Sequence, residues 1–244
     1  MTIRVAVLGA NGRMGAEVCR AVEAADDMTL AAGVDVGDDR EVLREASVVV
    51  DFTTPAAVMD NIKWCVDAGL NVVVGTTGFD DQRLQEVRTW LGVAPEVGVL
   101  VAPNFGIGAV LMMRFAATAA PYFDSVEIVE LHHPRKIDAP SGTARRTAEL
   151  VARARAGRAS PDATEQELEG ARGSAVSGVR IHAVRLEGLV AHQEVLLGGH
   201  GETLTIRHDS LSRESFMPGV LLGARWVRDH PGLTVGIESA LGLE

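Results

Sequence analysis

The sequence predicts an α/β protein with a doubly wound parallel sheet, followed by a second α+β domain that contains a mixed or antiparallel sheet. Two observations carry this expectation. In the first half, short apolar runs alternate with longer amphipathic runs, which is the pattern of buried strands joined by helices. Beyond residue 105 this alternation stops, and runs with partial period-two patterning appear toward the C-terminal half.

The apolar runs of the first half are short and mostly rich in valine, as strands covered on both faces are. We expect strands at residues 3–8, 30–34, 48–52, 72–74 and 99–102. We expect helices between them at residues 13–25, 40–45, 56–68 and 80–91. Right-handed crossovers of this kind place ligands at the carboxyl ends of the strands.

The second half predicts helices at residues 107–123, 145–156 and 216–229, and a long polar loop at 157–177. Strands are expected at 125–131, 180–186, 193–197, 203–208 and 233–237. The three runs between 180 and 208 fit antiparallel strands with one solvated face. We therefore expect a first domain over 1–105, completed by 217–244, and a second domain over 106–216.

Composition narrows the class of protein. Hydrophobic residues make up 47% and charged residues 23%, which is typical of globular proteins. The net charge of -10 argues against nucleic acid as a partner. The longest uncharged stretch, residues 97–113, is shorter than the ~20 apolar residues that span a membrane. Since Cys19 and Cys65 form no disulfide or metal pattern and no signal-peptide layout is present, we expect a soluble cytoplasmic protein.

A glycine-rich turn, Gly9-Ala10-Asn11-Gly12-Arg13-Met14-Gly15, lies between the first predicted strand and its helix. Glycines there allow a tight turn and a close approach of backbone N–H groups to a pyrophosphate at the helix N-terminus. Asp35 closes the second strand twenty residues after Gly15, where a ribose hydroxyl is bound in such domains. The combination predicts a Rossmann-type dinucleotide-binding domain; the alternative is a tight turn with a helix-capping aspartate.

The identity of the dinucleotide stays open between NADH and NADPH. Asp35 favours a free 2′-hydroxyl and so NADH. Arg13 lies in the turn and is able to meet a 2′-phosphate, which favours NADPH. Both features are present, so we expect dual use.

Residues 130–144 contain the closest grouping of candidate catalytic and anion-binding residues in the sequence. His132, His133, Arg135 and Lys136 lie within five positions, and a Pro-Ser-Gly-Thr turn then begins a helix. Ser141 or Thr143 would cap that helix, whose free N–H groups favour a carboxylate. Cations, proton donors and an anion pocket together suit an anionic substrate that must be protonated. The alternative is a basic loop in an ion-pair network with structural histidines.

No metal site is expected. His132 and His133 are adjacent, so their side chains diverge on a strand, and no zinc-type spacing of Cys or His occurs. Four further histidines lie in or near predicted strands, and we expect them to be surface or interface side chains: His182, His192, His200 and His208.

Together these motifs resemble the 4-hydroxy-tetrahydrodipicolinate reductase family over nearly the whole chain. The resemblance is carried by residues 7–15, Asp51-Phe52-Thr53, residues 75–79 and residues 102–105. The most specific part is residues 130–144, which fit the pattern E-x-H-H-x-x-K-x-D-x-P-S-G-T-A at every fixed position.

The resemblance implies a role for each matching residue. It implies His132 as proton donor and acceptor and Lys136 as proton donor. It implies that the substrate carboxylates are bound by His133, Gly142 and Thr143. It implies that the cofactor contacts Gly9, Ala10, Asn11, Gly12, Arg13 and Met14 at the pyrophosphate, Asp35 at the adenosine ribose, Gly75, Thr76 and Thr77 beside the nicotinamide, and also Ala102, Pro103, Asn104 and Phe105.

The implied reaction is the NAD(P)H-dependent reduction of 4-hydroxy-tetrahydrodipicolinate to tetrahydrodipicolinate, with loss of water, in lysine and diaminopimelate biosynthesis. The implied partners are a small cyclic dicarboxylate and, through the sheet of the second domain, three further copies in a homotetramer. Two alternatives remain. One is another two-domain NAD(P)-dependent dehydrogenase, and the other is a non-catalytic NAD(P)-binding sensor, which would not need His132 and Lys136.

Overall fold

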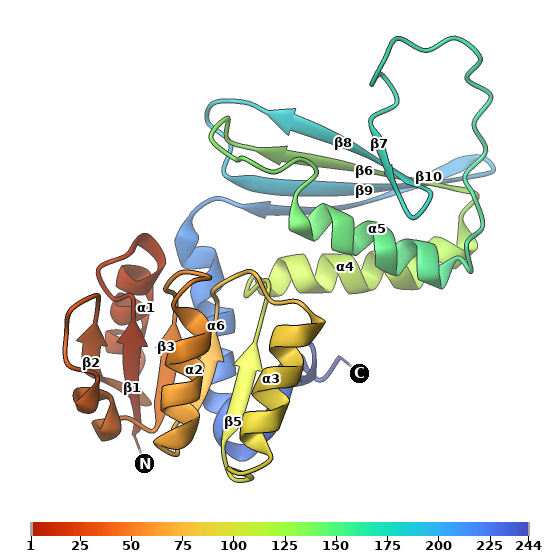
Figure 1. Ribbon diagram of the computed structural model, residues 1–244. Helices are drawn as coiled ribbons and strands as arrows, with labels where there is room; N and C mark the ends of the chain where they lie inside the picture. Colours follow the sequence, from red (N-terminus) through yellow and green to blue (C-terminus); the bar gives the residue numbers. More distant parts are fainter. Residues whose placement is uncertain (1, 244) are drawn as a thin grey trace. The chain divides into compact units, whose positions relative to one another are not determined.

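The computed structural model describes residues 2–243, which fold into two compact units (Figure 1). Unit 1 comprises the chain up to Ile107 together with the part from Arg213 onward, and unit 2 is Gly108–Ser212. Each unit is built around its own sheet. The chain thus leaves unit 1 after its fifth strand and returns to it for the last helix and strand.

Unit 1 contains a six-stranded sheet in the order β11-β5-β4-β3-β1-β2, and all of its neighbouring strands are parallel. The strands are β1 (Ile3–Leu8), β2 (Met28–Val34), β3 (Val48–Asp51), β4 (Asn71–Val74), β5 (Gly98–Val101) and β11 (Gly232–Val235). Because β1 lies between β2 and β3, the strand order reverses there. The expected doubly wound parallel sheet is confirmed.

Helices cover both faces of this sheet (Figure 1). They are α1 (Arg13–Glu23), α2 (Val58–Asp67), α3 (Asp81–Leu91) and α6 (Met217–Trp226). Alternate residues of the strands face opposite sides: Val72 and Val74 belong to the core cluster with α2 and α3 residues, whereas Val73 packs against Gly223 of α6. Strands buried on both faces explain why the sequence shows continuous valine runs.

Unit 2 contains a five-stranded sheet in the order β10-β9-β6-β8-β7. The strands are β6 (Ser125–His132), β7 (Ser174–Val176), β8 (Val179–Arg185), β9 (Ala191–Gly199) and β10 (Glu202–Ser210). The expected mixed sheet is confirmed: β9 runs antiparallel to both β10 and β6, and β8, which pairs antiparallel with β7, runs parallel to β6. A helix joins β6 and β8, and such a crossover returns the chain in the same direction.

Two helices, α4 (Ile107–Ala119) and α5 (Gly142–Ala154), lie along one face of this sheet (Figure 1). Val126, Ile128 and Val195 are buried on that side. Leu196, one residue further along β9, is 37% exposed because it points to the other face.

The remaining boundaries differ from expectation for local reasons. Helix α5 begins at Gly142, three residues earlier than expected, because Ser141 caps it. The helix expected over 107–123 ends at Ala119 and continues as a 3₁₀ turn, Ala120–Tyr122, where Pro121 lacks a backbone N–H. Residues 40–45 form a 3₁₀ helix, and the expected loop 157–177 contains β7.

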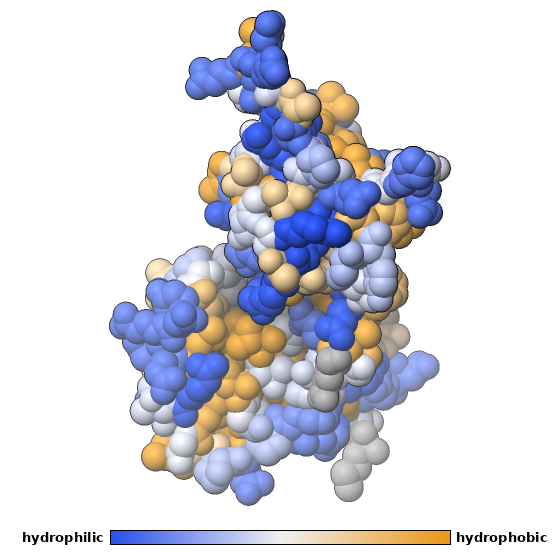
Figure 2. Space-filling view, turned by 90° about the vertical axis from the view of Figure 1, so that its right-hand side faces the viewer, coloured by the Kyte–Doolittle hydropathy of each residue, from blue (hydrophilic) through white to orange (hydrophobic). Residues whose placement is uncertain are grey.

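Figure 2 shows hydrophobic and hydrophilic residues interleaved in small patches over the face that it displays. Large exposed apolar side chains are spread along the chain, from Val36 to Val235. Scattered apolar side chains are normal for a protein surface. Within residues 2–243, the structure contains no helix of the length and apolarity that a membrane crossing requires.

Candidate active site

A hydrogen bond between two of its own glycines closes the glycine-rich turn between β1 and α1. Gly9 has a φ of +80°, and its carbonyl oxygen accepts a hydrogen bond of 2.9 Å from the N–H of Gly12. A Cβ atom on Gly15 would lie 2.0 Å from that same carbonyl oxygen. The first turn of α1 therefore sits directly against β1, an approach that only glycine permits.

The N-terminus of α1 is suited to an anion. Gly12 is the N-cap residue and supplies no side-chain hydrogen bond, and the first turn contains no acidic residue. Helices α3 and α5 differ, because Asp80 and Ser141 cap them with their side chains. Backbone N–H groups at an uncapped N-terminus, with Arg13 as the first helical residue, fit a pyrophosphate.

Asp35 follows β2 and is held against the glycine turn. One of its carboxylate oxygens accepts a hydrogen bond of 3.0 Å from the N–H of Asn11, and the other accepts one of 2.8 Å from Val36. The N–H of Asp35 in turn donates to the carboxylate of Asp38 at 2.8 Å. The structure thus places Asp35 beside the glycine-rich turn. The sequence predicts that both contact the same dinucleotide.

Asp51 joins the ends of two neighbouring strands, a role that sequence reasoning missed. Its buried carboxylate accepts hydrogen bonds from Thr53, through both N–H and hydroxyl, and from the side chains of Asn61 and Thr76 at 2.8 and 2.9 Å. Four hydrogen-bond donors therefore satisfy the oxygen atoms of this buried side chain. The loop that holds Thr76 is thereby fixed to the end of β3.

Aromatic packing connects the other expected cofactor segments. A Cβ atom on Gly75 would lie 2.1 Å from the ring of Phe52, so the ring occupies the space that glycine leaves. The rings of Phe52 and Phe105 pack with centroids 5.9 Å apart, and the N–H of Ala102 donates to Val74 at 3.0 Å. Residues 75–77 and 102–105 therefore gather at the carboxyl end of the sheet, where the turn at Gly9 also lies.

In unit 2, His132 is the last residue of β6, and its ring is oriented by a buried carboxylate. Its Nδ1 lies 2.5 Å from Oε2 of Glu130, which is fully buried. The guanidinium of Arg185 donates to both oxygens of Glu130, at 2.8 and 2.9 Å, and the N–H of Ser141 donates to Oε1 at 3.0 Å. This cluster joins β6, β8 and the start of α5.

The charge state of Glu130 follows from these contacts. Burial alone would raise the pKa of this carboxyl, but the hydrogen bonds and charges of His132 and Arg185 outweigh it and lower the pKa to about 2. Glu130 is therefore ionised at neutral pH and acts only as an acceptor, so Nδ1 of His132 is the donor in their hydrogen bond.

Lys136 lies in the loop after β6. Its ammonium is 2.7 Å from the carboxylate of Asp138, and the carbonyl of Asp138 accepts a hydrogen bond of 2.7 Å from Arg185. Burial would raise the pKa of Asp138, but the hydrogen bond and charge of Lys136 lower it below its ordinary value. His133 precedes this loop, is partly buried, and accepts the N–H of Lys136 at its carbonyl.

Helix α5 presents its N-terminus beside these groups. Ser141 caps it by accepting the N–H of Ala144 at 3.2 Å, which confirms one of the two expected caps. Gly142 and Thr143 are its first two residues, and a Cβ atom on Gly142 would meet nothing within 4 Å. The N–H groups at this end of α5 favour a carboxylate.

The other histidines depart in part from expectation. His192 is buried, at 8% exposure, and its Nδ1 lies 2.6 Å from Asp209. His208 packs against Gly108 at the start of α4, and burial lowers its pKa. His182 lies 2.7 Å from Glu127. Among residues 2–243, no group of His, Cys, Asp and Glu side chains is arranged to hold a metal ion.

A parallel sheet with a glycine turn and an aspartate after its second strand, combined with a unit in which His132 and Lys136 precede a helix N-terminus, defines a two-domain NAD(P)H-dependent oxidoreductase. Comparison with known families specifies which one. Residues 3–105 match the model "Dihydrodipicolinate reductase, N-terminus", and residues 108–241 match "Dihydrodipicolinate reductase, C-terminus". The chain belongs to the dihydrodipicolinate reductase family.

Individual relatives agree with this membership. The chain is 66% identical to the 4-hydroxy-tetrahydrodipicolinate reductase of Thermobifida fusca and 63% identical to that of Cutibacterium acnes, in each case over 99% of this chain and 100% of the relative. A dipicolinate-bound dihydrodipicolinate reductase from Paenisporosarcina sp. TG-14 superposes with a TM-score of 0.89 at 42% identity, covering 98% of this chain and 99% of that one. A probable dehydrogenase from Thermotoga maritima, at 14% identity and a TM-score of 0.63, shares the fold.

Proposed function

We propose that this protein reduces 4-hydroxy-tetrahydrodipicolinate to tetrahydrodipicolinate with NADH or NADPH, in lysine and diaminopimelate biosynthesis. The observation that carries the proposal is the arrangement in unit 2. There His132 is held by Glu130 and Lys136 is paired with Asp138, in the segment that leads from β6 to the N-terminus of α5. Two proton donors beside an anion-binding helix end suit a dicarboxylate that must gain a proton.

The residues of unit 1 fit the cofactor. The N-terminus of α1 has no side-chain cap and no acidic residue in its first turn, and the close contact of Gly15 with Gly9 shapes the turn in front of it, which together suit a pyrophosphate. When bound, the dinucleotide supplies the hydride. Asp35 accepts hydrogen bonds at both oxygens, and it would exchange the partner at Asn11 for a ribose hydroxyl.

The preference between the two dinucleotides is set at the end of β2. Asp35, Asp38 and Asp39 follow one another closely there, and Arg40 is paired with Asp60 at 2.7 Å. Carboxylates repel a 2′-phosphate, so we infer tighter binding of NADH. Arg13, at the start of α1, leaves NADPH usable, and both cofactors are accepted.

The chain's own residues would hold and protonate the substrate. His133 and the N-terminal residues Gly142 and Thr143 bind its carboxylates. Loss of the 4-hydroxyl as water gives a conjugated imine, and addition of hydride at C4 leaves an enamine that needs a proton. Lys136, with His132 as the second donor and acceptor, supplies that proton. General acid catalysis of this kind typically contributes ~10²–10⁴ in rate.

Assembly and location belong to the same proposal. The sheet of unit 2 has a second face, opposite the one that carries α4 and α5. Leu196 and Arg207 are exposed on this second face. We infer that this face pairs copies of the chain into a homotetramer, which sedimentation velocity tests. The free thiols Cys19 and Cys65 suit the reducing cytoplasm.

Pyridine-2,6-dicarboxylate, a stable planar dicarboxylate, tests the substrate class. It should inhibit turnover competitively against the substrate and should bind wild-type protein in calorimetry. Thr143→Val would weaken this binding, whereas NADH binding to unit 1 stays unchanged. Failure of the dicarboxylate to bind at all would contradict the assigned pocket.

A further inference from the structure

Glu130 contacts three parts of the proposed site: the ring of His132, the guanidinium of Arg185 and Ser141 at the start of α5. We propose that Glu130, clamped by Arg185, is a positioning residue that fixes both the ring of His132 and the anion-binding start of α5. This inference rests on the proposed function and deepens it. It concerns a residue that touches neither substrate nor cofactor and acts through its neighbours.

Each carboxylate oxygen of Glu130 accepts two hydrogen bonds. Oε2 receives Nδ1 of His132 at 2.5 Å and one nitrogen of Arg185 at 2.8 Å. Oε1 receives the N–H of Ser141 at 3.0 Å and the other nitrogen of Arg185 at 2.9 Å. One rigid carboxylate therefore sets the direction of the proton donor and the position of the residue that caps α5.

Arg185 extends the same connection to the loop of Lys136. Besides its two bonds to Glu130, it donates to the carbonyl of Asp138 at 2.7 Å, and Asp138 pairs with Lys136. A planar guanidinium matches a carboxylate with two parallel bonds and still has donors for a third partner. Both proposed proton donors are thus connected to one buried ion pair.

A fixed hydrogen bond at Nδ1 has a chemical consequence. Ionised Glu130 accepts only, so the neutral ring of His132 carries its proton on Nδ1 and leaves Nε2 as the nitrogen that exchanges a proton with a ligand. A histidine oriented by a carboxylate has one tautomer and one ring direction. Without Glu130, no carboxylate would fix the tautomer or the ring direction of His132.

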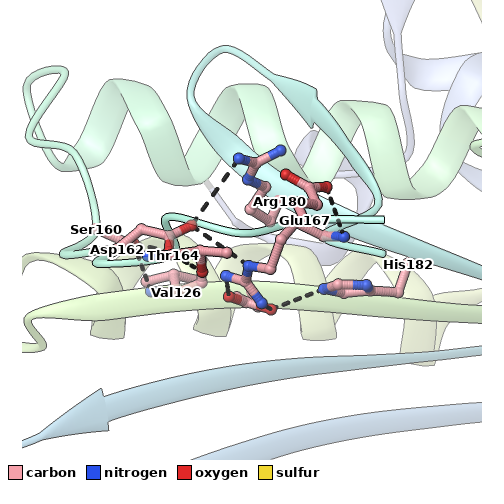
Figure 3. A network of polar contacts seen from close by, with 9 residues as sticks. Val126, Ser160, Asp162, Thr164, Glu167, Arg180 and His182 are labelled. Atoms are coloured by element: carbon pink, nitrogen blue, oxygen red, sulfur yellow. Dashed lines mark hydrogen bonds and ion pairs between the residues drawn. The ribbon is translucent and has the colours of Figure 1, made fainter. Parts of the chain in front are cut away.

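A similar cluster on the other face of the sheet provides a matched control. Glu127, three residues earlier on β6, is paired with Arg172 and with His182 of β8, and Arg172 also contacts Asp162 at 3.3 Å. Figure 3 shows these contacts around Asp162 and His182, together with the hydrogen bond from Val126 to Ser160. This cluster fastens the long loop to the sheet and includes none of the proposed site residues.

The first test compares Glu130→Gln with Glu127→Gln, each checked for fold by circular dichroism and for assembly by light scattering. Glutamine keeps the shape of glutamate but removes its charge and offers a donor in place of an acceptor. In Glu130→Gln we expect kcat to fall at least about tenfold and dicarboxylate affinity to fall, with the Kd for NADH unchanged. Glu127 lies on the sheet face proposed for assembly, so Glu127→Gln is compared as the assembly that light scattering shows to match wild type, and it should keep kcat within about twofold.

The second test is decided on wild-type protein, and two variants extend it. In ¹⁵N-histidine-labelled wild-type protein, at a pH where the ring is neutral, the His132 resonances should report a protonated Nδ1 and a bare Nε2. Glu130→Gln should abolish that single signature, and Arg185→Lys, which keeps the charge and loses the planar fork, should broaden it. A bare Nδ1 in the wild type would overturn the inference even if the variants did not fold.

The outcomes separate the two proposals. If wild-type protein binds both ligands but reduces no substrate, the proposed function fails, and the labelling result still decides the tautomer. If wild-type protein turns over substrate while Glu130→Gln keeps kcat, dicarboxylate affinity and the resonance pattern, the positioning role of Glu130 is wrong and the proposed function stands.

Discussion

The ammonium of Lys136 lies 2.7 Å from the carboxylate of Asp138, two residues further along the same loop. The two side chains are 22% and 39% exposed, so water screens the pair. Ion pairs of this kind are typically worth 0.2–1 kcal/mol. The ion pair is therefore weak enough for Lys136 to leave Asp138 when the proposed substrate binds.

Replacing Lys136 by alanine removes the proposed proton donor. We expect kcat to fall by about 10²–10⁴ while the Kd for NADH changes little, because Lys136 lies in unit 2 and the glycine turn in unit 1. Lys63, the only other lysine of the sequence, pairs with Asp67 on α2, and Lys63→Ala serves as the control. Stopped-flow kinetics and fluorescence titration measure the two quantities; equal loss of both would refute the assigned role.

Replacing Asp35 by alanine changes the cofactor preference. The carboxylate is placed against the turn by its hydrogen bond from Asn11, and its loss would remove the proposed charge-assisted hydrogen bonds to the ribose, which are typically worth about 1.5–3 kcal/mol. The affinity for NADH should fall at least about tenfold and that for NADPH by much less. Asp26→Ala, on the exposed turn before β2, is the control. An unchanged ratio of the two dissociation constants would exclude the ribose contact.

Gly15 and Gly223 are two buried helical glycines of unit 1 with different surroundings. A Cβ atom on Gly15 would meet the backbone of Gly9 at 2.0 Å, whereas one on Gly223 would meet side chains at 3.5 Å or more. Gly15→Ala should therefore weaken NADH binding at least about tenfold, and Gly223→Ala should leave it unchanged. Isothermal titration of NADH into each variant measures these affinities. An unchanged affinity in Gly15→Ala would contradict the prediction and would show that NADH binding tolerates displacement of the turn.

The ionisation of Glu130 makes stability depend on pH. Its pKa falls from an ordinary 4.5 to about 2 in the folded protein, so its contribution of about 3 kcal/mol is present above pH 4.5 and disappears as the pH falls toward 2. The difference in melting temperature between wild type and Glu130→Gln should narrow over that interval. Calorimetric scans at successive pH values measure it, and a constant difference would mean that Glu130 is not ionised in the folded state.

The sequence predicts unit 1 well because its signals are local. Valine runs, amphipathic helices and the turn at Gly9 each occupy a few consecutive residues, and the parallel sheet follows from their alternation. It predicts the strand pairing of unit 2 less well, because β8 lies between β6, to which it is parallel, and β7, to which it is antiparallel. Period-two patterning identifies a strand and one buried face, but it carries no information on the neighbour.

The same distinction applies to the site. His132, Lys136 and the cap at Ser141 lie in one segment, which the motif covers. Arg185 meets Glu130 from 55 residues away, and no local pattern in the sequence predicts that contact. Asp51 had a sequence signal, since it ends a buried strand and Thr53 follows it, but the donors Asn61 and Thr76 come from separate segments that the fold brings together.

The central claim is that unit 2 protonates a cyclic dicarboxylate while a dinucleotide bound by unit 1 reduces it. The most direct measurement follows the absorbance of NADH, and separately of NADPH, after wild-type protein is added to the freshly made condensation product of pyruvate and aspartate semialdehyde. The account predicts oxidation of both cofactors in proportion to the product added, and little oxidation with Lys136→Ala. Binding of NADH and pyridine-2,6-dicarboxylate without any oxidation of NADH or NADPH would contradict it and would favour a non-catalytic sensor.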